Sequence, residues 1–334
     1  MAETATRVLA SSAPSTVKLI SPHGDDDFGL LLRTGMQQAG MRTDGLFVPQ
    51  DPGRAKRTAV CSLMLDDQGD LISGVADMDI GQTALYPQTS ADTHGLPGLL
   101  TAESPEIVVF DGNIGGAQAD ELLAACETYS ARTAEFQGRR LLTLFEPTSI
   151  SKSAIVLDHF SLAKRNGQPT QPISFATPNV VELQQMHAAS TQLGLVPSPT
   201  IECSSCNLSV DPSIVEPAAV LQAKALVDAG IISVILLKVG RHGVITIDAE
   251  GARHHPVSAG KVHMVNTTGC GDSFAGAFAA TLSHFIKDQW PQSKAEWSEH
   301  IDTAVEVGQR AARSTLASTR AVGENMHLLL NSHL

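Results

Sequence analysis

Segments with the pattern of buried strands alternate with segments of helical periodicity along most of this chain, and this alternation constrains the fold most strongly. Short apolar runs predict strands at 17–20, 107–110, 141–144 and 232–238. Apolar residues at helical spacing predict long helices at about 116–128, 180–193, 214–229 and 298–317. Strands that are separated by helices form a parallel sheet with helices packed on its faces. The sequence therefore predicts one α/β domain over residues 1–334.

The segment 57–76 departs from that alternation. Residues 57–65 alternate in polarity, with Cys61, Leu63 and Leu65 on one side, and a polar turn at 66–69 precedes the returning segment 71–76. Neither arm is flanked by a helical pattern. We therefore expect a hairpin over about 57–80 that forms a small sheet of its own.

A further helix is expected soon after Gly24, ending at Gly40. Its apolar residues follow the spacing of one helix face, which predicts that this face is buried. The residues of the face are Phe28, Leu31, Leu32, Gly35, Met36 and Ala39.

The charge balance limits the partners of the chain. It carries 23 Lys and Arg against 35 Asp and Glu, a formal net charge of −12. An acidic chain repels phosphate backbones and anionic lipid, so we expect neither nucleic acid nor membrane as a partner. No apolar run approaches the roughly eighteen residues of a membrane span, and Glu3 and Arg7 interrupt the stretch that a signal peptide would need. The expected protein is cytoplasmic.

The five cysteines do not indicate a disulfide framework in a chain of 334 residues. Cys203 and Cys206 form a lone C-x-x-C pair, whereas a structural zinc site needs a second pair or two well-spaced histidines. The adjacent His254 and His255 do not supply that spacing. We therefore expect two cysteines in a polar loop rather than a metal or redox site.

Residues 265–278, V-N-T-T-G-C-G-D-S-F-A-G-A-F, are the most informative stretch for chemistry. A turn rich in threonine and glycine opens a helix whose apolar face is predicted to include Phe274, Phe278 and Leu282. Backbone N–H groups at the start of a helix suit a phosphate or a developing anion. A carboxylate placed there, that of Asp272, can orient an attacking hydroxyl and accept its proton. The shorter G-x-G-D alone favours a structural helix start, with Asp pairing with the helix dipole.

The whole run resembles the D-T-T-G-A-G-D-x-F-x-x-G signature of the ribokinase-like (PfkB-type) carbohydrate and nucleoside kinases. This resemblance implies a three-layer α/β/α sandwich with a mostly parallel central sheet and a small β lid, which is incomplete here. It also implies that Asp272 is the catalytic base and that the amides of Gly269, Cys270 and Gly271 stabilise the transferring phosphoryl group. Thr268 is implied to contact ATP.

Two further segments extend the resemblance to a nucleotide site. The T-P-N-V-V-E run at 177–182 resembles the family's N-x-x-E segment, which implies that Asn179 and Glu182 hold Mg²⁺ through water. Asn179 by itself is also an ordinary helix cap. The L-K-V-G-R-H-G-V run at 237–244 resembles the strand–turn–strand that lies against the ATP phosphates, which implies contacts from Lys238, Gly240 and Gly243. ATP and Mg²⁺ are therefore the implied cosubstrate and cofactor.

Within the family, several short segments look most like pseudouridine kinases. They are G-D-D-D-F-G at 24–29, A-D-M-D-I at 76–80, D-G-N at 111–113 and E-P-T-S at 146–149. Asp77, Asp111 and Asn113 are the implied nucleoside-binding residues. Asn266 replaces the common Asp near the family's monovalent-cation site, so the resemblance leaves activation by K⁺ undecided. It also allows a homodimer that pairs through the lids.

The implied reaction is ATP-dependent phosphorylation of the 5′-hydroxyl of a ribonucleoside, pseudouridine first. Residues 1–9 resemble the helix that follows the family's G-G-x-x-x-N motif, so we expect the first strand and that motif to be missing. The alternatives are a kinase for another sugar or nucleoside, such as ribose or adenosine, and an inactive relative that binds ATP. A Rossmann dehydrogenase is disfavoured, since no G-x-G-x-x-G follows an early strand.

Overall fold

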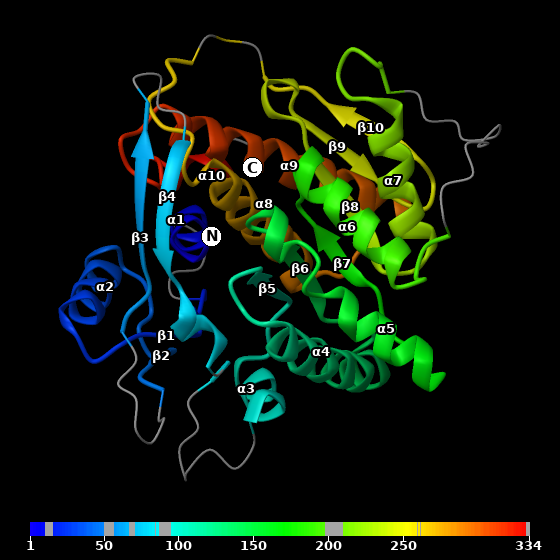
Figure 1. Cartoon of the computed structure of the whole chain (residues 1–334), viewed down its shortest axis with the longest axis horizontal. Coiled ribbons are helices and arrows are strands. Elements are labelled where there is room, and N and C mark those ends of the chain that lie inside the picture. The colour runs from blue at the N-terminus through cyan, green and yellow to red at the C-terminus, as the bar shows by residue number, and fades with distance from the viewer. Residues whose placement is uncertain are drawn as a thin grey trace. The chain divides into compact units, whose positions relative to one another are not determined.

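The computed structural model describes residues 1–10, 16–49, 57–66, 71–83, 85–86, 95–197, 210–258, 260 and 262–331 (Figure 1). These residues form two compact units. The first unit consists of Met1–Glu103 with Ser258–Leu334, and the second unit is Ser104–Val257. Cys203 and Cys206 lie outside the described residues, as does most of the predicted hairpin turn.

The second unit contains a six-stranded sheet in the order β10-β9-β8-β7-β6-β5. Its strands are β5 (Ile107–Asp111), β6 (Leu142–Glu146), β7 (Ile173–Ala176), β8 (Ile232–Lys238), β9 (Val244–Ile247) and β10 (Ala252–His255). Strands β5 to β8 are parallel, whereas β9 and β10 are antiparallel to their neighbours. The predicted α/β fold with a mostly parallel sheet is confirmed, and the carboxyl ends of β5 to β8 lie at one edge.

Strand β7 has no counterpart among the predicted strands. Its four residues include Ser174, which interrupts the apolar run. Ser174 is satisfied by the neighbouring strand, because its hydroxyl accepts from the N–H of Thr143 and its own N–H donates to the Thr143 hydroxyl, both at 3.1 Å. A polar pair between two strands is invisible to a search for apolar runs.

Helices of the second unit connect the parallel strands. They are α4 (Gly116–Gln137), α5 (Leu157–Asn166), α6 (Val180–Gln192) and α7 (Pro217–Asp228), with short 3₁₀ helices η2 (Ile150–Lys152) and η3 (Gly240–His242). Helix α4 continues well beyond the predicted end near residue 128 and stops where Gly138 takes a left-handed conformation, with φ 65°. Leu144, Phe145, Ile235 and Leu236 are fully buried in this unit.

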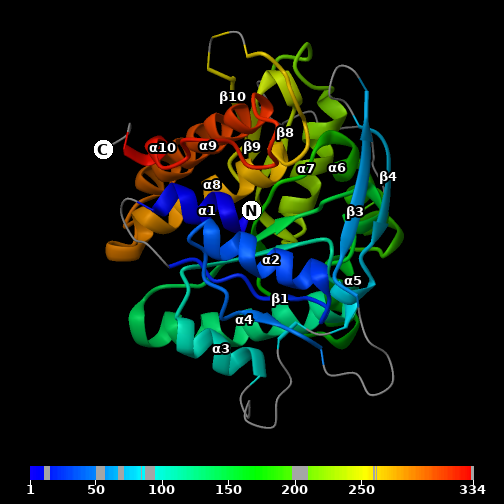
Figure 2. The same ribbon diagram turned by 90° about the vertical axis from the view of Figure 1, so that its left-hand side faces the viewer.

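The first unit is built around a pair of long helices, α8 (Cys270–Asp288) and α9 (Lys294–Leu316), which pack along each other. The predicted apolar face of α8, with Phe274, Phe278 and Leu282, is buried. Gly308 of α9 permits close packing, since a Cβ at that position would lie 2.8 Å from the ring of Phe274. Helix α1 (Ala2–Leu9) lies beside α8 in both views (Figures 1 and 2) and buries Val8 there.

The remaining elements of the first unit are short. They are α2 (Asp27–Gln38), α3 (Gly95–Glu103), α10 (Leu328–Asn331), η1 (Asp79–Gln82), and the strands β1 (Ser21–Pro22), β2 (Leu46–Phe47), β3 (Val60–Leu65) and β4 (Leu71–Asp77). As predicted, β3 and β4 form an antiparallel hairpin in a sheet of their own, which Figure 2 shows as two long arrows side by side. Among the described helices, none combines the length and apolar character needed to cross a bilayer.

The strand predicted at 17–20 is wrong by several residues. The observed strand β1 is Ser21–Pro22, and it pairs in parallel with β2. Its position is set by the backbone of the partner: the N–H of Ser21 donates to the Gly45 carbonyl at 3.2 Å, and that of His23 to the Phe47 carbonyl at 2.9 Å. The pairing partner, rather than the apolar run, decides where this strand lies.

The predicted buried face of α2 is wrong for most of its residues. Phe28 is 55% exposed and Leu31 is 68% exposed, although Met36 of the same face is buried, together with Gly29 outside it. The start of the helix is fixed by Asp26, whose carboxylate accepts from the N–H of Gly29 at 2.8 Å. A Cβ at Gly29 would lie 2.3 Å from the carbonyl oxygen of Gly24, so this glycine has to face inward. That close approach rotates the predicted apolar face toward solvent.

Candidate active site

Polar side chains end three of the four parallel strands in the second unit. Asp111 is the last residue of β5, Glu146 of β6 and Lys238 of β8. Thr177 follows directly after the end of β7. Ligand sites of open α/β sheets form outside the carboxyl ends of the strands. This edge of the sheet is therefore the candidate site of the second unit.

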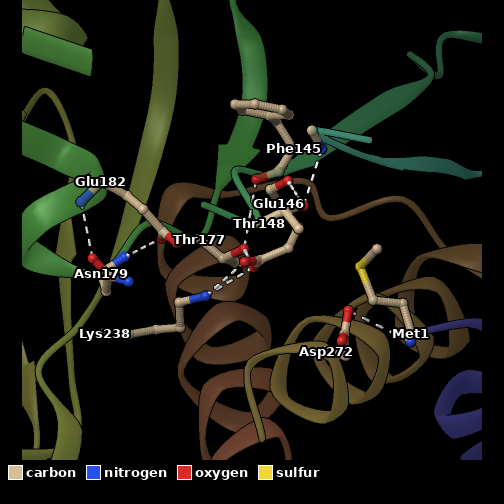
Figure 3. A network of polar contacts seen from close by, with 10 residues as sticks. Met1, Phe145, Glu146, Thr148, Thr177, Asn179, Glu182, Lys238 and Asp272 are labelled. Carbon is tan, nitrogen blue, oxygen red and sulfur yellow. Dashed lines mark hydrogen bonds and ion pairs between the residues drawn. The ribbon is translucent and has the colours of Figure 1, made fainter. Parts of the chain in front are cut away.

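Glu146 and Lys238 form an ion pair at this edge (Figure 3). Lys238 Nζ donates to the two carboxylate oxygens of Glu146, at 2.8 and 2.9 Å. The side chain of Glu146 is 7% exposed and that of Lys238 is 18% exposed. The buried hydroxyl of Thr177 also donates to the Glu146 carboxylate. These three side chains join the ends of β6, β7 and β8.

Asn179 and Glu182 form a capping box at the start of α6. Asn179 Oδ1 accepts from the N–H of Glu182 at 2.9 Å, and the Glu182 carboxylate accepts from the N–H of Asn179 at 2.8 Å. The N–H of Lys238 donates to the Pro178 carbonyl at 2.8 Å, which holds the cap beside the end of β8. Burial raises the pKa of the Glu182 carboxyl; the bond from Asn179 and the charge of Lys238 oppose this, and the charge of Glu146 adds to it.

An open pocket of about 560 Å³ borders the capping box. Its lining residues are Ser149, Ile150, Ser151, Asn179, Glu182 and Gln185. The capping box uses one oxygen of the Glu182 carboxylate, Oε2. Carboxylate and amide oxygens, often acting through water, suit Mg²⁺. Asn179 and Glu182 therefore fit the magnesium-supporting role that the N-x-x-E resemblance implies.

The turn after β8 presents bare backbone. Gly240 has φ 57° and Gly243 has φ 96°, conformations in which glycine is favoured. No described atom lies within 4 Å of a Cβ built at Gly240, so the backbone at this glycine is open to a ligand. The side chain of His242 pairs with its neighbour, since Arg241 Nε donates to His242 Nε2 at 3.2 Å. The predicted strand–turn–strand is present.

Asp111 and Asn113 are bonded to each other at the end of β5. Asp111 Oδ1 accepts from the N–H of Asn113 at 2.9 Å, and Asp111 Oδ2 accepts from Asn113 Nδ2 at 3.0 Å. Lys152 of η2 joins them, because its Nζ donates to Asn113 Oδ1 at 2.6 Å. Lys152 carries no sequence signal, since it is a single lysine in a serine-containing loop. The structure adds it to the pair that the sequence predicts.

Asp272 lies in the first turn of α8 in the first unit, and 52% of its side chain is exposed. The residue that precedes the helix, Gly269, has φ 84° and acts as its N-cap. The N–H of Cys270 donates to the Thr267 carbonyl at 3.3 Å. The α-amino nitrogen of Met1 lies 4.0 Å from Asp272 Oδ1 (Figure 3). Asp272 is thus an accessible carboxylate at the positive end of a long helix.

The turn before α8 is held by its own side chains. Asn266 Oδ1 accepts from the N–H of Thr268 at 2.9 Å, which fixes the approach to Gly269. Burial raises the pKa of the Cys270 thiol to about 11. This thiol is therefore protonated at neutral pH, and Cys270 contributes its backbone to the turn rather than a nucleophile.

Asp77 is the last residue of β4 in the hairpin. Its carboxylate oxygen Oδ2 lies 3.2 Å from a guanidinium nitrogen of Arg57, and the Arg57 side chain is 83% exposed. The predicted substrate residue Asp77 is thus a solvent-accessible carboxylate with an exposed partner. An exposed pair of this kind is weak, so the carboxylate can exchange Arg57 for a ligand.

The structure brings Asn179, Glu182 and Lys238 together within the second unit, and it adds Glu146 and Thr177 to them. Sequence reasoning names Glu146 only as part of the E-P-T-S segment and gives it no role. The usable signal is a charged residue at the end of an apolar strand, directly before a proline. The predicted residues Asp77 and 268–272 belong to the first unit.

Comparison with known proteins finds a family match for part of the chain. Residues 203–324 match the family described as pfkB family carbohydrate kinase. The pseudouridine-metabolizing bifunctional protein of Schizosaccharomyces pombe is 24% identical over 298 residues, which cover 79% of this chain and 34% of that protein. The chain thus spans about a third of the length of the curated relative it matches.

Solved ribokinases share the fold. Ribokinase from Giardia lamblia aligns with 100% of this chain and 87% of its own, at 16% identity and a TM-score of 0.68. Ribokinase from Arabidopsis thaliana, in a structure with ribose and ATP, aligns with 98% of this chain and 86% of its own, at 16% identity and a TM-score of 0.63. The chain therefore has a ribokinase-like fold, and its residues 203–324 resemble the pfkB family of carbohydrate kinases.

Proposed function

We propose that this protein transfers the γ-phosphoryl group of ATP to the 5′-hydroxyl of a ribonucleoside, with pseudouridine as the preferred acceptor. The observation that carries the proposal is the start of α8. An exposed carboxylate, Asp272, stands in the first turn of a 19-residue helix, directly after the left-handed Gly269. A helix start with this sequence supplies both a base and an anion-binding backbone, which phosphoryl transfer requires.

In this proposal Asp272 accepts a hydrogen bond from the attacking hydroxyl and takes its proton as the new P–O bond forms. The bond between the γ-phosphorus and the β,γ-bridging oxygen breaks in the same step, and ADP leaves. The amides of Gly269 and Gly271 stabilise the charge on the transferring group, and the amide of Cys270 joins them only by giving up its 3.3 Å bond to the Thr267 carbonyl. Lys238 and the bare turn at Gly240 and Gly243 bind the ATP phosphates. Mg²⁺, held through water by Asn179 and Glu182, would neutralise phosphate charge.

Asp77, Asp111 and Asn113 are the proposed acceptor-binding residues. Paired hydroxyl groups of a ribose match carboxylate and amide groups, which both accept and orient hydroxyl hydrogens. The Asp111–Asn113 pair is held rigid by its mutual bonds and by Lys152, so it meets an acceptor without further ordering. The preference for pseudouridine rests on the resemblance of four short segments to pseudouridine kinases and on the Schizosaccharomyces pombe relative.

Release of ADP with a panel of acceptors tests the proposal. Purified chain with ATP and Mg²⁺ is offered pseudouridine, uridine, adenosine and ribose, and we expect turnover to be fastest with pseudouridine. If ribose or adenosine were turned over faster, the proposed phosphotransferase activity would stand, but the proposed acceptor would be wrong. Tight binding of ATP without release of ADP with any acceptor would contradict the proposed kinase and favour a binding role.

A further inference from the structure

We infer that Glu146 is a positioning residue for nucleotide binding: with Thr177 it holds Lys238 at the sheet edge, so that the ammonium group meets the phosphates of a Mg–nucleotide complex. This inference rests on the proposed function and assigns a role to Glu146 that the sequence does not. It starts from an ion pair whose burial needs an explanation.

The buried pair is costly to form. Both partners come from strand ends, and 7% and 18% of their side chains remain exposed. Removing two charges from water costs several kcal/mol each, and a buried ion pair is often no more stabilising than an apolar pair of similar size. Stability alone therefore does not account for Glu146 and Lys238 at the carboxyl edge of a parallel sheet, where ligands bind.

Three hydrogen bonds hold Lys238 in place. Its backbone N–H donates to the Pro178 carbonyl at 2.8 Å, and its Nζ donates to both oxygens of Glu146. Glu146 is in turn held by the hydroxyl of Thr177. An ammonium group has three hydrogens, and the contacts to Glu146 use two of them. The third hydrogen remains for an anion that approaches the edge of the sheet.

The charges around Lys238 select the kind of anion. The N–H of Lys238 donates to the Pro178 carbonyl beside the capping box that holds Glu182, so two carboxylates and one ammonium group lie at this edge. Such a cluster carries an excess of negative charge and repels a bare phosphate. When a phosphate group binds together with a divalent cation, the cation neutralises part of the phosphate's negative charge and so reduces this repulsion. The cluster is thus suited to a nucleotide bound as its magnesium complex, with Glu182 facing the cation.

Binding of ADP with Mg²⁺, measured by calorimetry, tests the inference without any acceptor. The double variant Glu146→Gln/Lys238→Met removes both charges and keeps similar volume, so we expect it to fold. A hydrogen bond to a charged group is worth about 1.5–3 kcal/mol, so the affinity for Mg–ADP should fall by about tenfold or more. Affinity for adenosine, which has no phosphate, should not change.

The single variants separate positioning from simple stabilisation. In Glu146→Gln, Lys238 keeps its charge but loses its anchor, so the KM for ATP should rise while kcat changes less. A purely structural role would instead reduce the amount of active protein at constant KM. Thr177→Val is isosteric and removes only the hydroxyl that holds Glu146. Thr177→Val should raise the KM for ATP by a smaller factor. It is the variant to use if the double variant does not fold.

A second ion pair provides the matched control. Lys224 of α7 pairs with Asp228, and 17% of its side chain is exposed, close to the value for Lys238. The double variant Lys224→Met/Asp228→Asn should leave the affinity for Mg–ADP unchanged. Equal affinity of the Glu146/Lys238 double variant and the parent would overturn the inference. A parent that binds no ADP would overturn both proposals, whereas ADP binding without phosphorylation of any acceptor would overturn only the kinase.

Discussion

Gly269 lies directly against the carbonyl group of Ala321: a Cβ at position 269 would stand 2.3 Å from the Ala321 oxygen. Gly269 also has φ 84°, a left-handed conformation that residues with a side chain rarely adopt. Both constraints act at the turn that opens α8 and places Asp272. The glycine in the sequence signature is therefore required by packing as well as by its left-handed backbone conformation.

Gly269→Ala should be markedly destabilising, because the new methyl group meets backbone rather than a movable side chain. Backbone strain of this kind costs about 1–3 kcal/mol before the clash is added. Gly138→Ala is the matched control, since Gly138 has φ 65° and no described atom lies within 4 Å of its Cβ position. Chemical denaturation measures the loss of unfolding free energy in each variant. Equal losses would show that the contact with Ala321 does not add to the destabilisation of Gly269→Ala.

Asp272→Asn should preserve folding and ADP binding while turnover falls by orders of magnitude, because the amide cannot accept the proton of the attacking hydroxyl. The exposed Glu299→Gln on α9 is the control and should leave turnover unchanged. The measurement is ADP release at saturating substrate. A loss of less than about tenfold, which corresponds to only 1.4 kcal/mol of barrier, would exclude Asp272 as the base.

Asn179 has two roles that substitutions can separate. Asn179→Ala should destabilise the protein by about 1 kcal/mol, because the capping bond to the N–H of Glu182 is lost. Asn179→Asp keeps an equally good cap and should keep stability, yet it removes the amide hydrogens and adds a charge. If Asn179 supports magnesium-bound water, both variants should change the Mg²⁺ concentration needed for half-maximal turnover. If Asn179→Asp showed the Mg²⁺ dependence of the parent, Asn179 would act as a helix cap and not in binding magnesium.

His159 of α5 should make the stability of the second unit depend on pH. Its Nδ1 lies 2.7 Å from Asp120 Oδ1 and its Nε2 lies 3.2 Å from Glu127 Oε1, both on α4. Burial lowers the pKa of His159, but the hydrogen bonds and charges of Glu127 and Asp120 outweigh this and raise it overall. Glu127 also accepts from the N–H of Gln171 at 2.9 Å, which keeps it in place.

Because the folded pKa of His159 lies above the unfolded value of about 6.5, its contribution to stability is fully present below that pH. The contribution is lost as the pH rises through the folded pKa. The unfolding free energy of the parent should therefore exceed that of His159→Gln by more at pH 5.5–6 than at pH 9. Urea titrations at both pH values measure the two differences. A gap that does not shrink with rising pH would contradict the assignment of a charged His159.

Much of the second unit, and α8 of the first unit, could be predicted from the sequence, because these elements are encoded locally. The run 232–238 is apolar enough to be identified as a strand, and it is β8 with the same bounds. The helix start at Asn179 has a cap and an acidic partner three residues later, and both bonds of the capping box are present. The signature at 265–278 likewise places α8, its N-terminal glycine and its buried phenylalanines. Each of these depends on residues within a few positions of one another.

Tertiary structure decided which distant residues pair and which face of a helix is buried, because local sequence patterns do not contain this information. Lys238 and Glu146 are 92 residues apart, and they pair because β6 and β8 lie on either side of β7 in a parallel sheet. The face of α2 that is buried depends on the contact of Gly29 with the Gly24 carbonyl, although the apolar spacing points to another face. By itself, the sequence determined the apolar strands such as β8, the helix cap at Asn179 and the signature at 265–278, because short-range spacing and backbone preferences specify them. The partner of each charge and the rotation of each helix were left to packing, which joins residues that are distant along the chain.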